Sequence, residues 1–153
     1  MNNGYMLEKL TAKLYQKIGF NVEQDITLKG KSGSIHQIDL IASKGMWPKK
    51  ETIFIECKLR TNGYVGKADI SNFLLALDDL GQKNGSVITN SYYSENALKI
   101  GERYNLNLVD GKQLKDMCRK YGIRYNLPDV NEDPMKYIIS SFFDLLMIGR
   151  QKA

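Results

Sequence analysis

The stretch "TIFIECKLR", residues 52–60, ends an alternating apolar run with a charged pair. Successive side chains of a β-strand point to opposite faces, so Glu56 and Lys58 share one face and Cys57 points to the other. Phe54 shares the face of the charged pair. A charged pair at the end of an apolar strand is either a surface ion pair or the beginning of an active site. The stretch therefore predicts a strand, and the rest of the chain decides between these two interpretations.

The region before this strand predicts one helix and two further strands. Leucine and isoleucine recur at steps of three and four over residues 3–18, which indicates an amphipathic helix that Gly19 ends. The stretches "FNVEQDITL" and "HQIDLIA" then read as strands, and short turns separate them from each other and from residues 52–59. Three consecutive strands with short connections predict an antiparallel meander.

The pattern changes after Gly66, where helices and strands alternate. A helical stretch with Asp69 as its predicted N-cap ends at Gly81, the strand "GSVITN" follows, and Ser94 is the predicted cap of the next helix. The strand "LNLVDG" and the helix "KQLKDMCRKYG" complete this half. Alternating helices and strands predict parallel crossovers, so we expect an α/β fold with a mixed central sheet and helices on both faces, in three layers.

The C-terminal region differs from the rest. We expect one domain over residues 1–126, and residues 127–153 to form a turn-rich linker and a helix over residues 135–148. That helix is apolar on more than one face, so it must be buried. The sequence leaves open whether it packs on its own domain or forms a homodimer.

Composition narrows the class of protein. The 153 residues suit a single domain, and the net charge of +5 suits a polyanionic partner such as nucleic acid. Cys57 and Cys118 lie far apart and predict free thiols. The start of the chain lacks the layout of a signal peptide, and its most apolar stretch is too short to span a bilayer. We expect a cytoplasmic protein without a membrane partner.

The charged pair gains a chemical meaning from Asp39 in the preceding strand. If the two strands pair as a hairpin, Asp39 can lie close to Glu56, and two neighbouring carboxylates need a cation between them. Hard oxygen ligands select Mg²⁺ or Mn²⁺, and the main-chain carbonyl of Cys57 can add another oxygen. Lys58 would then face a substrate bound at the metal. Such an arrangement can hydrolyse a phosphodiester.

These residues resemble the signature of the PD-(D/E)xK nuclease superfamily, and the similarity is greatest to the Mrr-type restriction endonuclease catalytic domain. The resemblance covers residues 4–120, nearly the whole predicted domain. Its matching positions, in chain order, are Gly4 and Glu8, Gly19 and Phe20, residues 38–42, 56–58 and 87–90, and Ser94 with Ala97. The triplet 56–58 alone occurs by chance in many proteins, but the ordered set is far more specific.

The resemblance implies a restriction-endonuclease-like fold and a Mg²⁺- or Mn²⁺-dependent DNA endonuclease. It implies that Asp39, Glu56 and Lys58 are catalytic and that Glu8 joins them from the first helix. The superfamily's proline before the aspartate is replaced here by Ile38, and no separate DNA-reading domain is recognisable. A Holliday junction resolvase-like nuclease and a non-catalytic DNA-binding module of the same fold remain alternatives.

Four further polar residues are predicted to contact the substrate. Gln37 shares the face of Asp39, and Arg60 and Lys67 follow the catalytic lysine. Asn90 ends a predicted parallel strand, where crevices tend to form in open α/β sheets.

Overall fold

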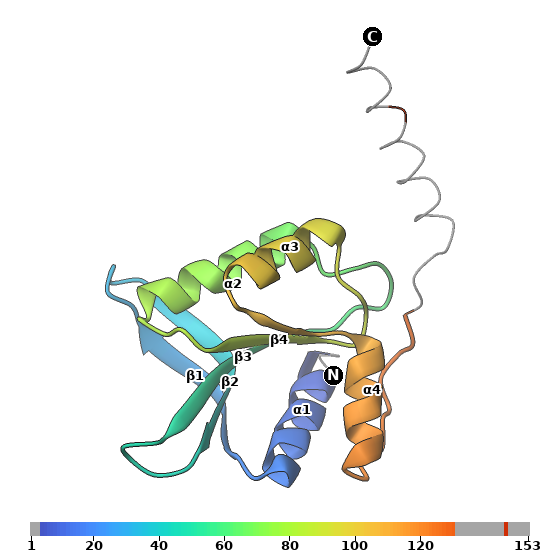
Figure 1. Ribbon diagram of the computed structural model, residues 1–153, viewed down its shortest axis with the longest axis horizontal. Coiled ribbons are helices and arrows are strands. Elements are labelled where there is room, and N and C mark those ends of the chain that lie inside the picture. Colours follow the sequence, from blue (N-terminus) through green and yellow to red (C-terminus); the bar gives the residue numbers. More distant parts are fainter. Residues whose placement is uncertain (1–3, 131–145, 147–153) are drawn as a thin grey trace.

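Three consecutive strands form an antiparallel meander in the computed structural model, which describes residues 4–130 and residue 146 (Figure 1). They are β1 (Asn21–Lys29), β2 (Ile35–Lys44) and β3 (Glu51–Lys58). Strand β3 contains the "IECK" stretch, and it lies between β2 and the parallel half of the sheet. The predicted meander is confirmed.

The second half of the sheet is parallel. Helix α2 (Lys67–Asp79) connects β3 to β4 (Gly85–Thr89), and α3 (Glu95–Arg103) connects β4 to β5 (Asn107–Val109). Strand β4 pairs with β3 and β5 pairs with β4, both in parallel register. Parallel neighbours require such crossover connections. The sheet therefore has the order β1-β2-β3-β4-β5.

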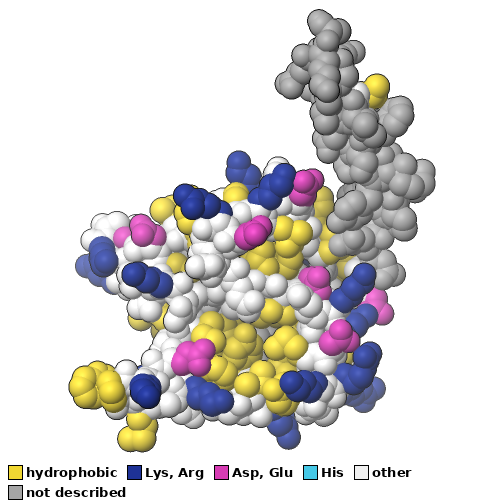
Figure 2. Space-filling model, in the orientation of Figure 1, with side chains coloured by type: hydrophobic (Ala, Val, Ile, Leu, Met, Phe, Trp, Pro, Cys, Tyr) yellow, Lys and Arg dark blue, Asp and Glu magenta, His cyan; other side chains and the backbone are white. Residues whose placement is uncertain are grey.

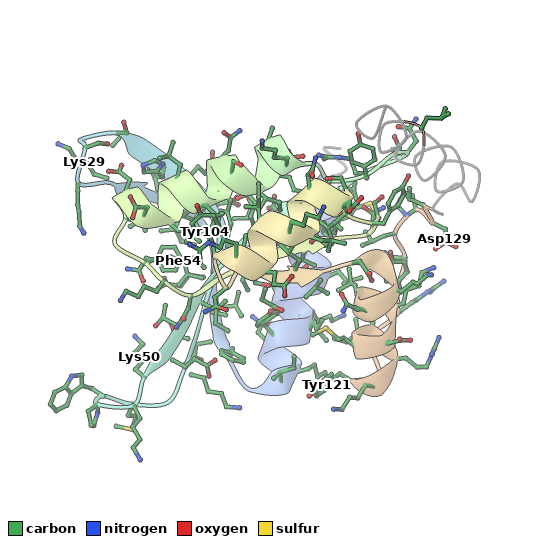
Figure 3. The ribbon with its side chains drawn as sticks, turned by 45° about the horizontal axis from the view of Figure 1, so that its top comes forward. Lys29, Lys50, Phe54, Tyr104, Tyr121 and Asp129 are labelled. Atoms are coloured by element: carbon green, nitrogen blue, oxygen red, sulfur yellow. The ribbon has the colours of Figure 1, made fainter. Side chains whose placement is uncertain are left out.

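Helices cover both faces of the sheet, so the predicted three layers are confirmed (Figure 1). Helices α1 (Gly4–Ile18) and α4 (Gly111–Lys120) lie on one face, where Ile55 and Ile88 are fully buried. Helices α2 and α3 lie on the other face, where Phe54 is buried (Figure 3). Strand β3 thus supplies alternate side chains to two separate cores.

The helix ends agree with the sequence at three positions and differ at one. Gly19 and Gly81 have positive φ angles beyond α1 and α2, and the Ser94 hydroxyl accepts the Ala97 N–H at the start of α3. The prediction that Asp69 is the N-cap of α2 is wrong, because Gly66 occupies that position. Asp69 lies three residues later, and its carboxylate accepts a hydrogen bond from the main-chain N–H of Gly66.

The alternation of side chains slips where β1 and β2 face each other at Asp25 and Asp39. Ile38 packs in the core beneath α2 and α3, whereas Leu40 packs in the core beneath α1 and α4. Regular alternation along β2 would place these two side chains on one face, so the strand is irregular at Asp39. Asp25 has a φ of 52°, and the paired residues on either side place it opposite Asp39. Two carboxylates thus meet at an irregular step of the sheet.

The chain remains packed against the domain beyond α4. Leu127 is buried in the core beneath α1 and α4, and the carbonyl of Pro128 accepts a hydrogen bond from Asn90. The predicted helix 135–148, with its packing or dimerisation role, lies outside the described residues except for Leu146, which is exposed. None of the helices within residues 4–130 has the length and apolar character needed to cross a bilayer.

Candidate active site

Glu56 and Lys58 lie side by side at the end of β3. The Lys58 Nζ is 2.9 Å from the Glu56 Oε1, and both side chains are partly buried. Phe54 on the same face is buried beneath α2 and α3, whereas Ile55 points to the opposite core. The predicted shared face is therefore confirmed. Glu8, Asp25 and Asp39 lie around this pair. A simple surface ion pair would not need these additional acidic groups.

Asp39 is held next to this pair by the main chain of β3. The Cys57 N–H donates a hydrogen bond of 2.8 Å to the Asp39 Oδ2, although Asp39 and Glu56 fall just beyond the paired residues of the β2–β3 ladder. Burial raises the pKa of Asp39, and the Cys57 hydrogen bond and the Lys58 charge partly offset that rise. Burial and the Asp39 charge raise the pKa of Glu56, against the effect of Lys58.

Helix α1 brings Glu8 to the same place. The neighbouring Leu7 is fully buried and anchors this turn of the helix to the core, while Glu8 is half-buried and lines the same hollow as Asp39 and Glu56. Burial raises the pKa of Glu8 to about 7, and the negative charges of Asp39, Asp25 and Glu56 contribute to that rise. The structure therefore assembles three predicted acidic residues from three different elements.

A hollow of about 540 Å³ lies between these elements. We call it the acidic hollow, and it is lined by Tyr5, Met6, Glu8, Asp25, Gln37, Asp39 and Glu56. Gln37 thus lies where the sequence predicted it, beside Asp39. The acidic hollow has four carboxylates in its lining and no lysine or arginine, and Lys58 lies next to it, ion-paired with Glu56.

Asp25 is the site residue that sequence reasoning missed. It sits in an alternating stretch whose apolar positions look regular, so its neighbours in the sequence carry no signal of the slip. Aspartate is one of the few residues that tolerate a positive φ, but this preference is too weak to locate one. The useful signal is the pairing of β1 with β2, which places Asp25 opposite Asp39.

The residues of the acidic hollow fit a hard divalent cation by their chemistry. Carboxylate oxygens are the ligands that Mg²⁺ and Mn²⁺ prefer. Burial raises the pKa of Glu8 and Glu56 most, and a cation would relieve the mutual repulsion that adds to this rise. In the described part of the chain, no three acidic, histidine or cysteine side chains stand as a preformed metal site. Glu56 instead directs one oxygen to Lys58.

Asn90 has a structural role rather than contact with the hollow. Its side chain is 3% exposed, its Oδ1 accepts the N–H of Arg60, and its Nδ2 donates to the carbonyls of Arg60 and Pro128. A substrate contact from Asn90 is therefore not supported, because all of these groups face inward. The side chain instead fixes the loop that follows Lys58. Beside it, the Thr89 hydroxyl donates to the Lys58 carbonyl.

The two other predicted substrate contacts, Arg60 and Lys67, differ in whether their charged groups are already engaged within the protein. Arg60 pairs with Asp69 at 3.0 Å and also donates to the carbonyls of Leu59 and Tyr64, so its guanidinium already fixes the start of α2. Lys67 is exposed at the first position of α2.

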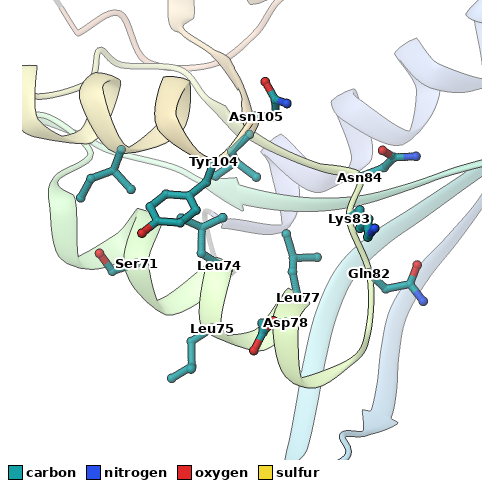
Figure 4. A pocket seen from close by; sticks show the side chains of 12 residues that line it. Ser71, Leu74, Leu75, Leu77, Asp78, Gln82, Lys83, Asn84, Tyr104 and Asn105 are labelled. Atoms are coloured by element: carbon teal, nitrogen blue, oxygen red, sulfur yellow. The ribbon is translucent and has the colours of Figure 1, made fainter.

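A hollow larger than the acidic hollow lies elsewhere in the described part of the chain. It has a volume of about 800 Å³ and lies between α2, α3 and the segment before β4, on the face of the sheet opposite α1 (Figure 4). Leucines and Tyr104 dominate its lining, and Asp78 is its single carboxylate. It contains none of the predicted catalytic residues, whereas Glu8, Asp39 and Glu56 line the smaller acidic hollow.

The mixed sheet between two helical layers, with clustered carboxylates and a lysine at the end of its central strand, defines a restriction-endonuclease-like protein. The model of the Mrr catalytic domain family, described as a restriction endonuclease, matches residues 1–118. The chain therefore belongs to the Mrr-type restriction endonuclease family. No curated protein matches it significantly.

Three solved structures resemble the chain and agree on the fold. A protein of unknown function, AF1548, has a TM-score of 0.70 at 20% identity, over 79% of this chain and 67% of that one. The DNA modification-dependent restriction endonuclease AspBHI has a TM-score of 0.52 at 14% identity, over 80% and 36%. Protein VC1899 from Vibrio cholerae has a TM-score of 0.51 at 17% identity, over 75% and 31%. The match thus spans about a third of the last two proteins.

Proposed function

We propose that the protein is a DNA endonuclease that depends on Mg²⁺ or Mn²⁺ and hydrolyses phosphodiester bonds. The observation that carries this proposal is the meeting of acidic side chains from α1, β2 and β3 around one hollow, next to a lysine. Membership of the restriction endonuclease family supports the same class of reaction. The proposal places the protein in the cytoplasm, where it would meet DNA.

In this proposal, Asp39 and Glu56 hold the metal, and Glu8 and the main-chain carbonyl of Cys57 are further ligands. When bound, a divalent metal polarises a phosphoryl oxygen and lowers the pKa of a water molecule. The Cys57 N–H keeps the Asp39 carboxylate turned towards β3, which leaves its second oxygen for the metal. Asp25 adds negative charge at the opposite wall of the acidic hollow.

Lys58 supplies the positive charge. Burial alone lowers the pKa of Lys58, but the hydrogen bond and the charge of Glu56 outweigh it, so the net pKa is raised and the ammonium group stays protonated. A protonated lysine can donate hydrogen bonds to a phosphate oxygen and to the attacking water, and it stabilises negative charge that develops on the phosphate. The Thr89 hydroxyl holds the Lys58 carbonyl and so fixes the position of this residue.

The substrate contacts in the proposal are limited to groups that can reach DNA. Gln37 lines the acidic hollow and can contact the scissile phosphate or its water. Lys67 is exposed at the start of α2 and can contact a neighbouring phosphate. Arg60 can do so only in competition with Asp69, so we expect it to act mainly by positioning the loop after Lys58.

Incubation of the pure protein with supercoiled plasmid, with Mg²⁺ or with EDTA, tests the proposal. We expect nicking with Mg²⁺ and none with EDTA. Replacing Lys58 by alanine should reduce the rate by at least about 100-fold, the typical cost of one group that stabilises transition-state charge. DNA affinity should stay near that of the wild type. Lys83→Ala is the matched control, because this exposed lysine lines the hollow between α2 and α3 and not the acidic hollow.

A four-way DNA junction in the same assay separates the alternatives. Paired symmetric cuts at the junction, without nicking of plasmid, would favour a resolvase-like nuclease. Binding without any cleavage in Mg²⁺ or Mn²⁺ would contradict the proposed hydrolysis and favour a non-catalytic DNA-binding module. Cleavage by Lys58→Ala at the wild-type rate would refute the catalytic assignment of this residue.

A further inference from the structure

A second hollow continues from the acidic hollow along helix α1. Its volume is about 640 Å³, and it lies between α1, strand β1 and the segment after α4. We call it the α1 groove, and it is lined by Met6, Lys9, Leu10, Ala12, Lys13, Gln16, Gln24, Ile123, Arg124 and Asn126. Met6 lines both hollows, so the α1 groove and the acidic hollow adjoin at the first turns of α1.

The two adjoining hollows have opposite charge. The α1 groove has three cationic side chains in its lining, Lys9, Lys13 and Arg124, and no carboxylate. Its other polar groups are the amides of Gln16, Gln24 and Asn126, which can donate hydrogen bonds to an anion without adding charge. If a polyanion lay over both hollows, one of its anionic groups would lie at the carboxylates of the acidic hollow. The anionic groups that follow would lie among the cations of the α1 groove.

The cations of the α1 groove are spaced for a chain of phosphates. Lys9 and Lys13 are one helical turn apart on the same side of α1, a rise of roughly 6 Å. That rise is close to roughly 6.8 Å, the rise of two successive phosphates along one DNA strand. Arg124 comes from the opposite wall of the groove.

The cations of the groove are also available for binding. Within residues 4–130, Lys13 and Arg124 form no ion pair and both are exposed. The Lys9 Nζ lies 5.3 Å from the centre of the Tyr5 ring, which itself lines the acidic hollow. Lys and Arg side chains are also visible over α2 and α3 (Figure 2), so charge alone does not single out this face. The α1 groove is distinguished by its position next to the acidic hollow, with which it shares Met6.

We propose that the DNA strand cleaved in the acidic hollow continues along the α1 groove, where Lys13 and Arg124, assisted by Lys9, bind its phosphates. This inference rests on the proposed nuclease function and adds to it the path of the substrate. Phosphate contacts of this kind position DNA without reading its sequence, because every nucleotide presents the same backbone. The α1 groove therefore sets the register of the strand over the carboxylates.

The test is a double replacement, Lys13→Gln with Arg124→Gln, in the full chain. Binding to a fluorescent DNA duplex is measured by anisotropy in EDTA over a series of salt concentrations, so that cleavage does not interfere. Losing two phosphate contacts should reduce the slope of log affinity against log salt by about 1.8, which corresponds to about 60-fold weaker binding near 0.1 M salt. Circular dichroism and the melting temperature confirm that the variant is folded.

The matched control is Lys83→Gln with Arg103→Gln, which removes the same two charges. Both residues are exposed, and they lie with α2 and α3 on the opposite side of the sheet. We expect this variant to bind with a nearly unchanged slope. An unchanged slope for the groove variant, or an equal loss of DNA affinity in both variants, would overturn the proposed path of the DNA strand along the α1 groove.

The two proposals fail in different ways. If the wild-type protein nicks plasmid but the groove variant binds DNA like the wild type, the strand path is wrong and the nuclease function stands. If the wild-type protein neither binds nor cleaves DNA, both proposals are wrong.

Discussion

Replacing Asn90 by alanine tests whether Lys58, the proposed catalytic lysine, depends on the buried hydrogen bonds that Asn90 makes behind it. The wild-type side chain makes three hydrogen bonds, at 2.8 and 2.7 Å to the main chain of Arg60 and at 3.0 Å to the carbonyl of Pro128. Asn90 is only 3% exposed, so its replacement by alanine would leave these main-chain groups without a partner and without ready access to water. The loop after Lys58 should therefore loosen.

The magnitude follows from the number of bonds lost. Each hydrogen bond contributes roughly 0.5–1.5 kcal/mol net, so three of them correspond to a loss of about 3 kcal/mol in the free energy of unfolding. For a domain of this size that loss lowers the melting temperature by roughly 6–12 °C. Urea denaturation followed by circular dichroism measures the free energy directly, and the nicking rate at a temperature where the variant is folded measures the effect on Lys58.

The control for this prediction is Asn96→Ala. Asn96 is exposed on α3, and its replacement should change the free energy of unfolding by no more than about 0.5 kcal/mol. If Asn90→Ala is as stable as this control, the Asn90 hydrogen bonds do not stabilise the domain. If Asn90→Ala is unstable but cleaves DNA at the wild-type rate while folded, these hydrogen bonds stabilise the domain without positioning Lys58.

Two further predictions concern the proposed metal and Asp79, the last residue of α2. Mg²⁺ at a hundredfold excess over its dissociation constant should stabilise the wild-type protein by about 2.7 kcal/mol and so raise its melting temperature. Differential scanning fluorimetry should show this rise for the wild type and none for Glu56→Gln. Separately, hydrogen bonds from His36 and Ser32 lower the pKa of Asp79 to about 2 from its ordinary value of 3.8. Because the folded pKa is the lower one, this carboxylate stabilises the protein above pH 3.8 and ceases to do so as the pH falls to about 2. Urea denaturation across that window should show a shallower pH dependence for Asp79→Asn, and an identical dependence would contradict the assignment.

The order of elements and the central part of the site could be predicted because their signals are local. An alternating apolar run, a glycine after a leucine stripe and a serine before a helix each act within a few residues, and the strands, Gly19 and Ser94 agree with them. Glu56 and Lys58 share a face for the same reason. Asp39 needed one further step, the pairing of two strands joined by a short turn.

The structure differs from the sequence-based predictions at positions where contacts between residues distant in the sequence determine the local structure. Asp25 reaches the site because β1 and β2 both slip at the same level of their ladder, which the sequence near Asp25 does not indicate. Asn90 was expected to face a crevice at the end of β4, but the loop after Lys58 and the segment after α4 fold over it and take all of its hydrogen bonds. Asp69 has the residue type of a cap, but Gly66 occupies the cap position, and Asp69 pairs with Arg60 from inside the first turn.

The central claim is that side chains from α1, β2 and β3 bind one catalytic divalent metal. Crystals of the protein soaked in Mn²⁺, with data collected for anomalous scattering, test it directly. We expect an anomalous peak in the acidic hollow, in contact with the carboxylates of Asp39 and Glu56, and no such peak in crystals of the Asp39→Asn variant. Mn²⁺ bound elsewhere, with the acidic hollow empty at saturating concentration, would contradict the claim.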